Sequence, residues 1–321
     1  RRCLVCGGPV AVCSRSRAHG LDAICAETAR RLAEFACTTL GDLAADALRE
    51  EAALSPKPGL VDARTNGAHT DMDLTLMLRS AETLRPWFCR MVRLGLDGAA
   101  PAQLQNAGRQ AEAQMLQATG GVNTHKGAIF SLGIACASLG MGYGAPLCVH
   151  ETLARCGEMT GAQMRRELEA AKAGQARTFG EAIYQKAGVG GVRAEAASGF
   201  ASVREIALPR LNAGLKAGLS LNDAALCTLT ALMADTQDTN AVRRGGDAGA
   251  AAMRETARAL DGEIAAALEA GEMKQKIGRL KEKLTDWDGQ MSAAGISPGG
   301  CADLLAMALL MAFCERDAAE A

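Results

Sequence analysis

The sequence predicts an all-α protein, a single multi-helix globular domain in which polar, glycine-bearing loops converge on one site. Alanine and leucine dominate while aromatic residues make up only 3% of the chain, which suits closely packed helices better than sheets. Long stretches have helical periodicity and lack the alternation that is typical of strands. With 321 residues, 49% of them hydrophobic, the chain has enough apolar material for a sizeable core.

Charge and cysteine content exclude several classes of protein. The formal net charge is −1, which argues against a nucleic-acid-binding surface, so any anion binding must come from local clusters. No stretch reaches the roughly 18–20 apolar residues that cross a bilayer. The twelve cysteines are mostly scattered singly through apolar stretches, which favours reduced thiols and a cytoplasmic location. The chain begins at Arg1 without an initiator Met, so we expect a fragment of something longer.

Residues 1–21, RRCLVCGGPVAVCSRSRAHGL, differ from the rest by their density of Cys and Arg. Cys3, Cys6, Cys13 and His19 could supply the four ligands of a zinc ion. The first pair has the right spacing, but the second is irregular. We therefore favour unligated thiols in a tail over a zinc site, and we interpret the arginines after Cys13 as a solvated face.

The remaining helices follow from periodicity, caps and breakers. The first covers residues 22–54, and a break is expected near Gly41. Gly140–Gly144 is interpreted as a helix end and turn rather than a dinucleotide site, because no strand precedes it. Further helices are expected at 73–95, 101–118, 123–139, 163–173, 179–187, 194–217, 221–234, 247–270, 272–285 and 304–314.

The first polar loop follows Ser55, where prolines at 56 and 58 prevent the helix from continuing. Its side chains could bind metal, phosphate or sugar. The alternative is a surface loop leading into a helix capped by Thr70, with Asp73 three residues later. The candidate site residues here are Lys57, Gly59, Asp62, His69, Asp71 and Asp73.

The second polar stretch is Thr119–Gly133, TGGVNTHKGAIFSLG, and we expect the rest of the chain to be organised around it. Its glycine pair can adopt positive φ or approach a ligand, and Asn123 or Thr124 can cap the helix that follows. The helix N-terminus and a lysine would together attract an anion. The alternative is an ordinary capped core helix. The candidates are Gly120, Gly121, Asn123, Thr124, His125 and Lys126.

Two further polar stretches complete the set. Residues 235–246 combine carboxylates, an amide, arginines and a glycine pair, which suit a metal–phosphate site or a solvated helix connection. Residues 297–303 form a helix start that could face an anion or act only as a cap. No Walker motif is present. The candidates are Asp235, Asp238, Asn240, Arg243, Arg244, Gly245, Gly246, Ser297, Gly299, Gly300 and Asp303.

Taken together, five segments resemble the triphosphoribosyl-dephospho-CoA synthase family over about residues 40–315. The resemblance implies an all-α enzyme that transfers the triphosphoribosyl group of ATP to 3′-dephospho-CoA and releases adenine. The product is the precursor of the prosthetic group of citrate lyase or malonate decarboxylase. The segments are SPKPGLVD (Ser55–Asp62), GAHTDMD (Gly67–Asp73), ATGGVNTHKGAIFSLG (Ala118–Gly133), DTNAVRRGG (Asp238–Gly246) and SPGGCADLL (Ser297–Leu305).

Residues 1–21 resemble the C-terminal end of a second family, the apo-citrate lyase phosphoribosyl-dephospho-CoA transferase. This implies a fused bifunctional protein with a transferase remnant at 1–21 and the helical synthase domain at 22–321. Gln237 stands before Asp238 where a smaller residue is expected, so we expect the local turn to differ in shape from that of the family.

For this activity we expect Lys57, Lys126, Arg243 and Arg244 to bind phosphates. Mg²⁺ would be held against the triphosphate by Asp71, Asp73, Asp235 and Asp238. One carboxylate could instead be the general base, and His69 or His125 could assist the departure of adenine. Two alternatives remain: a Mg²⁺-dependent phosphohydrolase or phosphotransferase, and a non-catalytic nucleotide-binding module. The sequence leaves the base, the metal count and the oligomeric state open.

Overall fold

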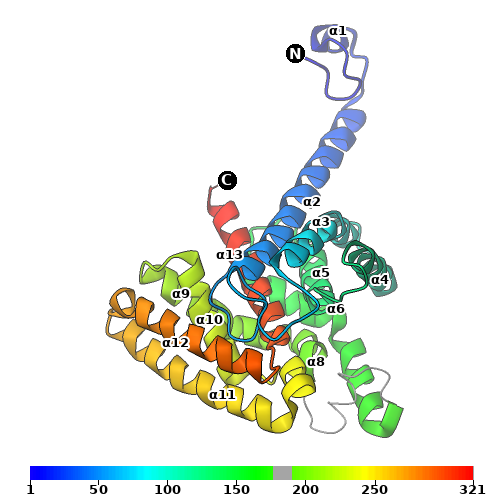
Figure 1. Cartoon of the computed structure of the whole chain (residues 1–321). Helices are drawn as coiled ribbons and strands as arrows, with labels where there is room; N and C mark the ends of the chain where they lie inside the picture. Colours follow the sequence, from blue (N-terminus) through cyan, green and yellow to red (C-terminus); the bar gives the residue numbers. More distant parts are fainter. Residues whose placement is uncertain (176–189, 321) are drawn as a thin grey trace.

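The structure is a computed structural model that describes residues 1–175 and 190–320. It confirms the predicted all-α fold (Figure 1). Across these residues no strand forms, and the β-type pairing is a single isolated bridge between Arg2 and Pro9. None of the described helices combines the length and apolarity needed to cross a membrane. The elements are α1 (Val10–Ser16), α2 (Leu21–Ala53), α3 (Leu74–Leu96), α4 (Pro101–Ala118), α5 (Lys126–Met141), α6 (Val149–Ala170), the π-helical turn η1 (Ala171–Gln175), α8 (Gly191–Ala197), the π-helical turn η2 (Val203–Ala207), α9 (Leu208–Lys216), α10 (Leu221–Asp235), α11 (Thr239–Glu269), α12 (Met273–Ala293) and α13 (Gly299–Glu320).

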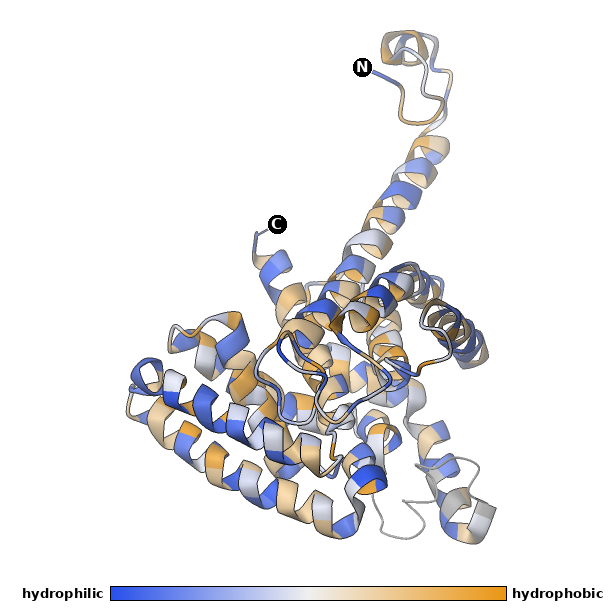
Figure 2. Ribbon diagram, viewed as in Figure 1, coloured by the Kyte–Doolittle hydropathy of each residue, from blue (hydrophilic) through white to orange (hydrophobic). Residues whose placement is uncertain are grey.

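Three helices, α5, α10 and α13, form the centre of the core. Residues 128–140 are buried almost without interruption, as are 224–234 and 304–311. These helices are apolar on all sides, so they can be stable only inside the molecule. The amphipathic helices α2, α3, α4, α6, α11 and α12 surround them, and Figure 2 shows α11 and α12 with alternating polar and apolar patches.

Glycines let the helices around the site approach closely. At Gly41 in α2, an added Cβ would lie only 2.6 Å from the backbone nitrogen of Cys89 in α3. At Gly95 in α3, it would collide with the backbone carbonyl group of Ala137 in α5. The predicted helix break near Gly41 is therefore wrong. This glycine serves helix packing, and α2 runs through it without interruption.

Helix α11 begins earlier than predicted. Instead of starting near residue 247 it starts at Thr239, because Asp238 caps it by accepting hydrogen bonds from the backbone N–H groups of Asn240 and Ala241. The helix then kinks at Gly246, whose φ of 67° is in the left-handed region. As a result, Arg243 and Arg244 lie in the first turns of a helix rather than in a loop.

Other boundaries also differ. The predicted helix at 194–217 is divided, because the chain turns at Phe200 with a positive φ of 54° before it becomes helical again at Ala201. Helix α6 starts earlier than the predicted residue 163, and α12 and α13 are longer than predicted. The helix expected at 179–187 lies outside the described residues.

The N-terminal part of the chain projects away from the body of the molecule (Figure 1). Helix α2 is exposed along most of its first half, and its buried face starts at Ala36. Helix α1 sits at the far tip of α2, so residues 1–19 lie well away from the central helices. The predicted domain boundary after residue 21 falls at the start of α2 and stays a prediction.

Candidate active site

A cavity of about 1090 Å³ opens where the polar loops meet. Its volume is at the upper end of the range for small-molecule sites, so it can hold a large ligand or two ligands. Helices α2 to α6, α8, α11 and α13 contribute to its wall. The predicted site residues that line it are Lys57, His69, Asn123, Thr124, His125, Lys126, Asp238, Asn240, Arg243, Arg244, Ser297, Gly299, Gly300 and Asp303.

The other predicted residues do not line this cavity. Asp71 and Asp73 are exposed near the start of α3, where Asp73 caps the helix by accepting a hydrogen bond from Leu76 N. Asp235 is exposed at the end of α10. The remaining residues outside the wall are Gly59, Asp62, Gly120, Gly121, Gly245 and Gly246.

The turn between α4 and α5 presents the start of α5 to the cavity. Gly120 and Gly121 have φ values of 66° and 93°, so they use the left-handed conformation expected of this pair. The Asn123 Oδ1 atom accepts a hydrogen bond from Lys126 N at 3.2 Å, as predicted for a capping residue. The exposed Lys126 ammonium group lies 2.6 Å from a carboxylate oxygen of Glu112 on α4.

His125 is buried directly before α5. Its Nδ1 atom lies 2.7 Å from Ser80 Oγ, which also accepts a hydrogen bond from the Thr124 hydroxyl. Burial, reinforced by the charge of Lys57, lowers the pKa of His125 to about 3. The imidazole is therefore neutral at pH 7, and within residues 1–175 and 190–320 its Nε2 atom has no hydrogen-bond partner.

The loop between α2 and α3 is organised by two buried aspartates. Asp62 accepts hydrogen bonds from the Ser55 hydroxyl and from the backbone N–H groups of Lys57, Arg64 and Thr65, at 2.6–2.9 Å. Its carboxylate is thus fully engaged in holding the loop. It is a structural residue in this arrangement.

The second of these aspartates, Asp288 on α12, anchors the same loop to the bundle. It accepts hydrogen bonds from Gly59 N at 2.8 Å and from the Thr65 hydroxyl at 2.9 Å. Gly59 has a φ of 72°, and an added Cβ would collide with the carbonyl oxygen of Ile296. Gly59 is thus required for this close approach.

Lys57 forms a buried ion pair below the cavity. Its ammonium group donates to a carboxylate oxygen of Glu51 at 2.7 Å and to the Glu51 carbonyl oxygen at 2.6 Å, and both side chains are almost inaccessible. Sequence reasoning missed Glu51, although a signal existed. Glu51 falls on the same helical face as Ala44, Ala47 and Leu48, and a charge on an apolar face needs a partner.

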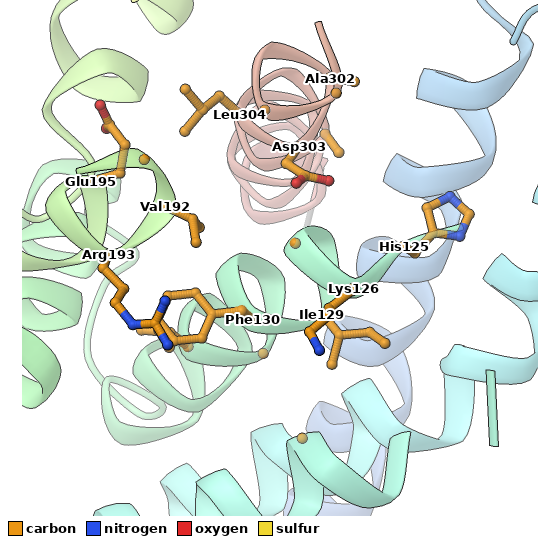
Figure 3. Close-up of a pocket in the computed structure, with 18 of the residues that line it drawn as sticks. His125, Lys126, Ile129, Phe130, Val192, Arg193, Glu195, Ala302, Asp303 and Leu304 are labelled. Atoms are coloured by element: carbon orange, nitrogen blue, oxygen red, sulfur yellow. The ribbon is translucent and has the colours of Figure 1, made fainter. Parts of the chain in front are cut away.

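Two carboxylates lie at the starts of α11 and α13. Asp238 accepts hydrogen bonds from Asn240 N, Ala241 N and Cys301 N, so it joins the two helix starts, and burial raises its pKa. Asp303 is different: Figure 3 shows its carboxylate pointing from α13 into the space beside the start of α5. Burial raises the pKa of Asp303 well above its ordinary value, with further contributions from Glu51 and Asp238.

The side chain of Asp303 also explains why residue 127, in the first turn of α5, is a glycine. The Asp303 carboxylate packs against Gly127, where an added Cβ would collide with one of its oxygens. The backbone N–H of Ala128 in the first turn of α5 favours the ionised form and partly offsets the effect of burial on the Asp303 pKa. The start of α5 therefore holds a carboxylate against the cavity.

A cationic group closes another side of the cavity. The Arg244 guanidinium donates to the Ala68 carbonyl oxygen and to His69 Nδ1, each at 3.0 Å. With Nδ1 accepting, His69 Nε2 carries the proton and donates to Ser297 Oγ at 3.0 Å. Burial, and next the charge of Arg244, lower the pKa of His69, so this imidazole is also neutral at pH 7.

The rest of the wall is largely apolar and was not predicted. Met91, Ile134, Met141 and Met164 line it from three helices. Sequence periodicity gave no signal for these residues, because apolar side chains on core helices look alike whether they face a cavity or a neighbour. Four charged wall residues were also missed, namely Arg109, Glu112, Arg193 and Glu195.

The four aspartates expected to bind Mg²⁺ are not gathered by the fold. Within residues 1–175 and 190–320, one group of three or more His, Cys, Asp or Glu residues has ligand atoms within 4.8 Å of one another, and it lies at the N-terminus. Asp238 alone of the four lines the cavity, and its oxygens already accept backbone N–H groups. The described residues thus do not fit a protein-held Mg²⁺ at these positions.

A helical bundle with arginines, a helix N-terminus and a cavity-facing carboxylate around one large cavity would suit an all-α enzyme that acts on an anionic substrate. A family model described as CitG: ATP:dephospho-CoA triphosphoribosyl transferase matches residues 37–320. The chain belongs to this family. The match excludes the exposed N-terminal segment.

Curated relatives agree with the family assignment. The chain is 39% identical over 287 residues to a probable 2-(5''-triphosphoribosyl)-3'-dephosphocoenzyme-A synthase of Pectobacterium carotovorum, covering 86% of this chain and 90% of the relative. A protein of the same name from Pseudomonas fluorescens is 41% identical, over 87% and 92% of the two chains. The Pectobacterium atrosepticum synthase is 38% identical, over 83% and 86%. No solved structure matches the chain.

Proposed function

We propose that the protein transfers the 5-triphosphoribosyl group of ATP to the 2′-hydroxyl group of 3′-dephospho-CoA and releases adenine. The product is 2′-(5″-triphosphoribosyl)-3′-dephospho-CoA. Family membership and the names of the relatives support this reaction. The observation that carries it in this chain is the Asp303 carboxylate, which faces a large cavity beside the start of α5.

The triphosphate would bind at the cationic side of the cavity. Arg243, Arg244 and Lys126 line the wall, and their positive charges favour a polyanion. Lys57 contributes differently from our expectation, because its charge is balanced by Glu51. We propose that it supports the cavity floor rather than binding phosphate directly.

Asp303 is the best-placed general base. Burial raises the pKa of Asp303, and a carboxylate with a raised pKa is a more effective proton acceptor. It would take the proton of the 2′-hydroxyl group while that oxygen forms a bond to C1 of the ATP ribose. The bond from C1 to adenine breaks, and adenine leaves with the bonding electrons and takes up a proton. The carboxylate would also stabilise the positive charge that develops on the ribose.

The neutral histidines suit a supporting role in this reaction. The buried Nε2 atom of His125 has no hydrogen-bond partner among the residues that the structure describes, so it is available for a hydrogen bond with a substrate atom. Mg²⁺ would enter as part of the ATP substrate, bound to the triphosphate, rather than in a site built from Asp71, Asp73, Asp235 and Asp238. The cytoplasmic location stays a prediction that rests on the scattered cysteines.

The product would serve as the precursor of the prosthetic group of citrate lyase or of malonate decarboxylase. The N-terminal segment that resembles the citrate lyase transferase favours the first, and it suggests a covalent fusion of the two enzymes. We propose this fusion from the sequence of residues 1–21 alone.

The reaction can be tested directly. The protein is mixed with ATP, Mg²⁺ and 3′-dephospho-CoA, and products are analysed by chromatography, mass spectrometry and NMR of the new anomeric proton. We expect free adenine and a product that keeps all three phosphates of ATP, joined through an α linkage. Release of phosphate or ADP with the adenine–ribose bond intact would identify a phosphohydrolase or phosphotransferase instead. Binding without turnover would identify a non-catalytic module.

A further inference from the structure

The N-terminal module, residues 1–19, gathers four potential metal ligands at the tip of α2. The Sγ atoms of Cys3, Cys6 and Cys13 and a ring nitrogen of His19 all lie within 4.8 Å of one another. The module lies outside the region that matches the family model. It is also far from the cavity, so the proposed transferase reaction makes no use of these residues (Figure 1).

The backbone around Cys3 and Cys6 forms a tight turn. Cys3 N donates to the Gly8 carbonyl oxygen at 2.6 Å, and Gly7 N donates to the Cys3 carbonyl oxygen at 3.0 Å. Gly7 has a φ of 70°, which a glycine directly after Cys6 adopts without strain. The turn thereby directs both thiols of the C-x-x-C pair to the same side.

The third and fourth ligands come from α1 and the residues after it. Cys13 lies on α1, which ends at Arg17 in a left-handed conformation with a φ of 50°. Ala18 N donates to the Cys13 carbonyl oxygen at 3.1 Å, which folds the chain back over the helix end. This reversal brings His19 to the three thiols, so the spacing that looked irregular in the sequence is compensated by the fold.

Two independent observations indicate that the module needs a ligand. The His19 Nε2 atom is buried and has no hydrogen-bond partner in the described part of the chain, which is costly for a polar atom. The module also has almost no hydrophobic core: Cys3 is its one buried side chain, while Val10 and Val12 are exposed. Segments this small usually need a metal or disulfides to hold a unique fold.

We infer that Cys3, Cys6, Cys13 and His19 bind one Zn²⁺ ion in a closed, structural site. Three thiolates and one imidazole are a typical tetrahedral zinc set, and four protein ligands leave no open position for catalysis. The site would have a net charge of about −1, and Arg1, Arg2, Arg15 and Arg17 surround it in the sequence. The geometry reverses our preference, based on the sequence, for unligated thiols.

The ion would fix the module on α2. The Arg31 guanidinium on α2 donates to the Leu4 carbonyl oxygen at 2.8 Å, within the C-x-x-C turn. Arg31 also pairs with Glu27, so the contact belongs to a small network along the exposed half of α2. Zinc binding would therefore order both the turn and its attachment to this helix.

The test uses the full chain, purified under reducing conditions without a metal-affinity tag. Zinc is measured by inductively coupled plasma mass spectrometry, and Co²⁺ is added to chelator-treated protein as a spectroscopic probe. We expect about one zinc per chain and the intense visible bands of a tetrahedral cobalt–thiolate site. Cys13→Ser and His19→Ala should each lose most of the zinc at a competing chelator concentration that wild type withstands.

Cys25→Ser is the matched control, because Cys25 is an exposed thiol on α2 outside the group. It should keep both the zinc and the cobalt spectrum. Adenine release should be unchanged in all three variants, so failure of this proposal is distinguishable from failure of the proposed function. Wild type that takes up neither metal, or Cys13→Ser that keeps its zinc, would overturn the site. So would a disulfide between Cys6 and Cys13, whose Sγ atoms are 3.4 Å apart, if intact mass detects it in protein purified in parallel without reductant.

Discussion

The loop between α2 and α3 and the turn between α4 and α5 both carry dense polar motifs, but they use them differently. In the first, Asp62 and Lys57 are buried and satisfied by the loop itself or by α2. In the second, the start of α5 supports Asp303 and leaves the buried Nε2 atom of His125 without a partner. The first motif builds a wall of the cavity, and the second presents chemical groups to it.

This difference shows why a polar motif in a sequence does not by itself indicate a substrate contact. A buried carboxylate such as Asp62 must be paired, and backbone N–H groups are the nearest donors in a tight loop. A carboxylate that faces a cavity, such as Asp303, keeps fewer partners and a raised pKa. Substitutions in the two motifs should therefore separate stability from catalysis.

The largest effect is expected from Lys57→Met in the loop between α2 and α3. The substitution leaves the Glu51 carboxylate buried without its cation, which typically costs about 3–5 kcal/mol. The free energy of unfolding is measured by denaturant titration. Lys126→Met is the matched control, because its ion pair with Glu112 is largely exposed and should change stability by less than about 1 kcal/mol. An equal loss of stability in the two variants would contradict the structural role assigned to Lys57.

The second prediction concerns Asp303→Asn. If Asp303 is the general base, kcat should fall by about 10²–10⁴-fold. Stability should be kept or raised, because a negative charge beside Glu51 and Asp238 is removed. The measurements are adenine release and thermal unfolding of the same preparation.

Asp62→Asn is the control for Asp303→Asn and should behave in the opposite way. The substitution replaces a carboxylate that accepts four hydrogen bonds with an amide that is a weaker acceptor. This should cost about 1–3 kcal/mol of stability. The rate per folded molecule should change little. A large loss of stability in Asp303→Asn, with normal turnover, would show that Asp303 has a structural role instead.

How much of this could be predicted from the sequence depends on the kind of signal. Caps and breakers located α4 and α5 well, because Pro101 and the pair Gly120 and Gly121 act locally. Gly41 was misinterpreted because its role, close contact with Cys89, is set by a partner far along the chain. Local propensity cannot distinguish a glycine that ends a helix from one that lets two helices touch.

The candidate site shows the same limit. The motifs located Asp303, Asn240 and Ser297 in the cavity wall, because the loops that carry them meet there. Glu51 was missed because it lies in the last turn of α2, just before the loop that carries the polar motif. The four aspartates were grouped by their chemistry, but Asp73 and Asp238 act as helix caps in the fold. A charged residue in a polar motif can therefore mark the end of a helix as well as a metal ligand.

The smallest of the three effects is a pH dependence of stability that comes from His125. Burial lowers its pKa from the ordinary value of 6.5 to about 3. As pH falls below 6.5, the unfolded chain therefore binds a proton at this residue while the folded chain does not. The stability that neutral His125 contributes is present above pH 6.5 and is lost progressively between about pH 6.5 and 3. Each pH unit in that range costs about 1.4 kcal/mol.

His125→Asn isolates this contribution, because the Asn amide oxygen can replace Nδ1 as an acceptor for Ser80 but does not titrate. Between pH 7 and pH 5 wild type should lose roughly 2 kcal/mol more stability than the variant. The measurement is denaturant unfolding of both proteins at a series of pH values. The comparison of wild type with variant cancels the other buried groups, including Asp303 and Asp238, whose raised pKa values act in the opposite direction. Parallel pH profiles would show that His125 has the same pKa in the folded and the unfolded chain, so that burial does not keep the imidazole neutral. Below pH 6.5 the folded protein would then carry an imidazolium beside Lys57, which could donate a proton to adenine.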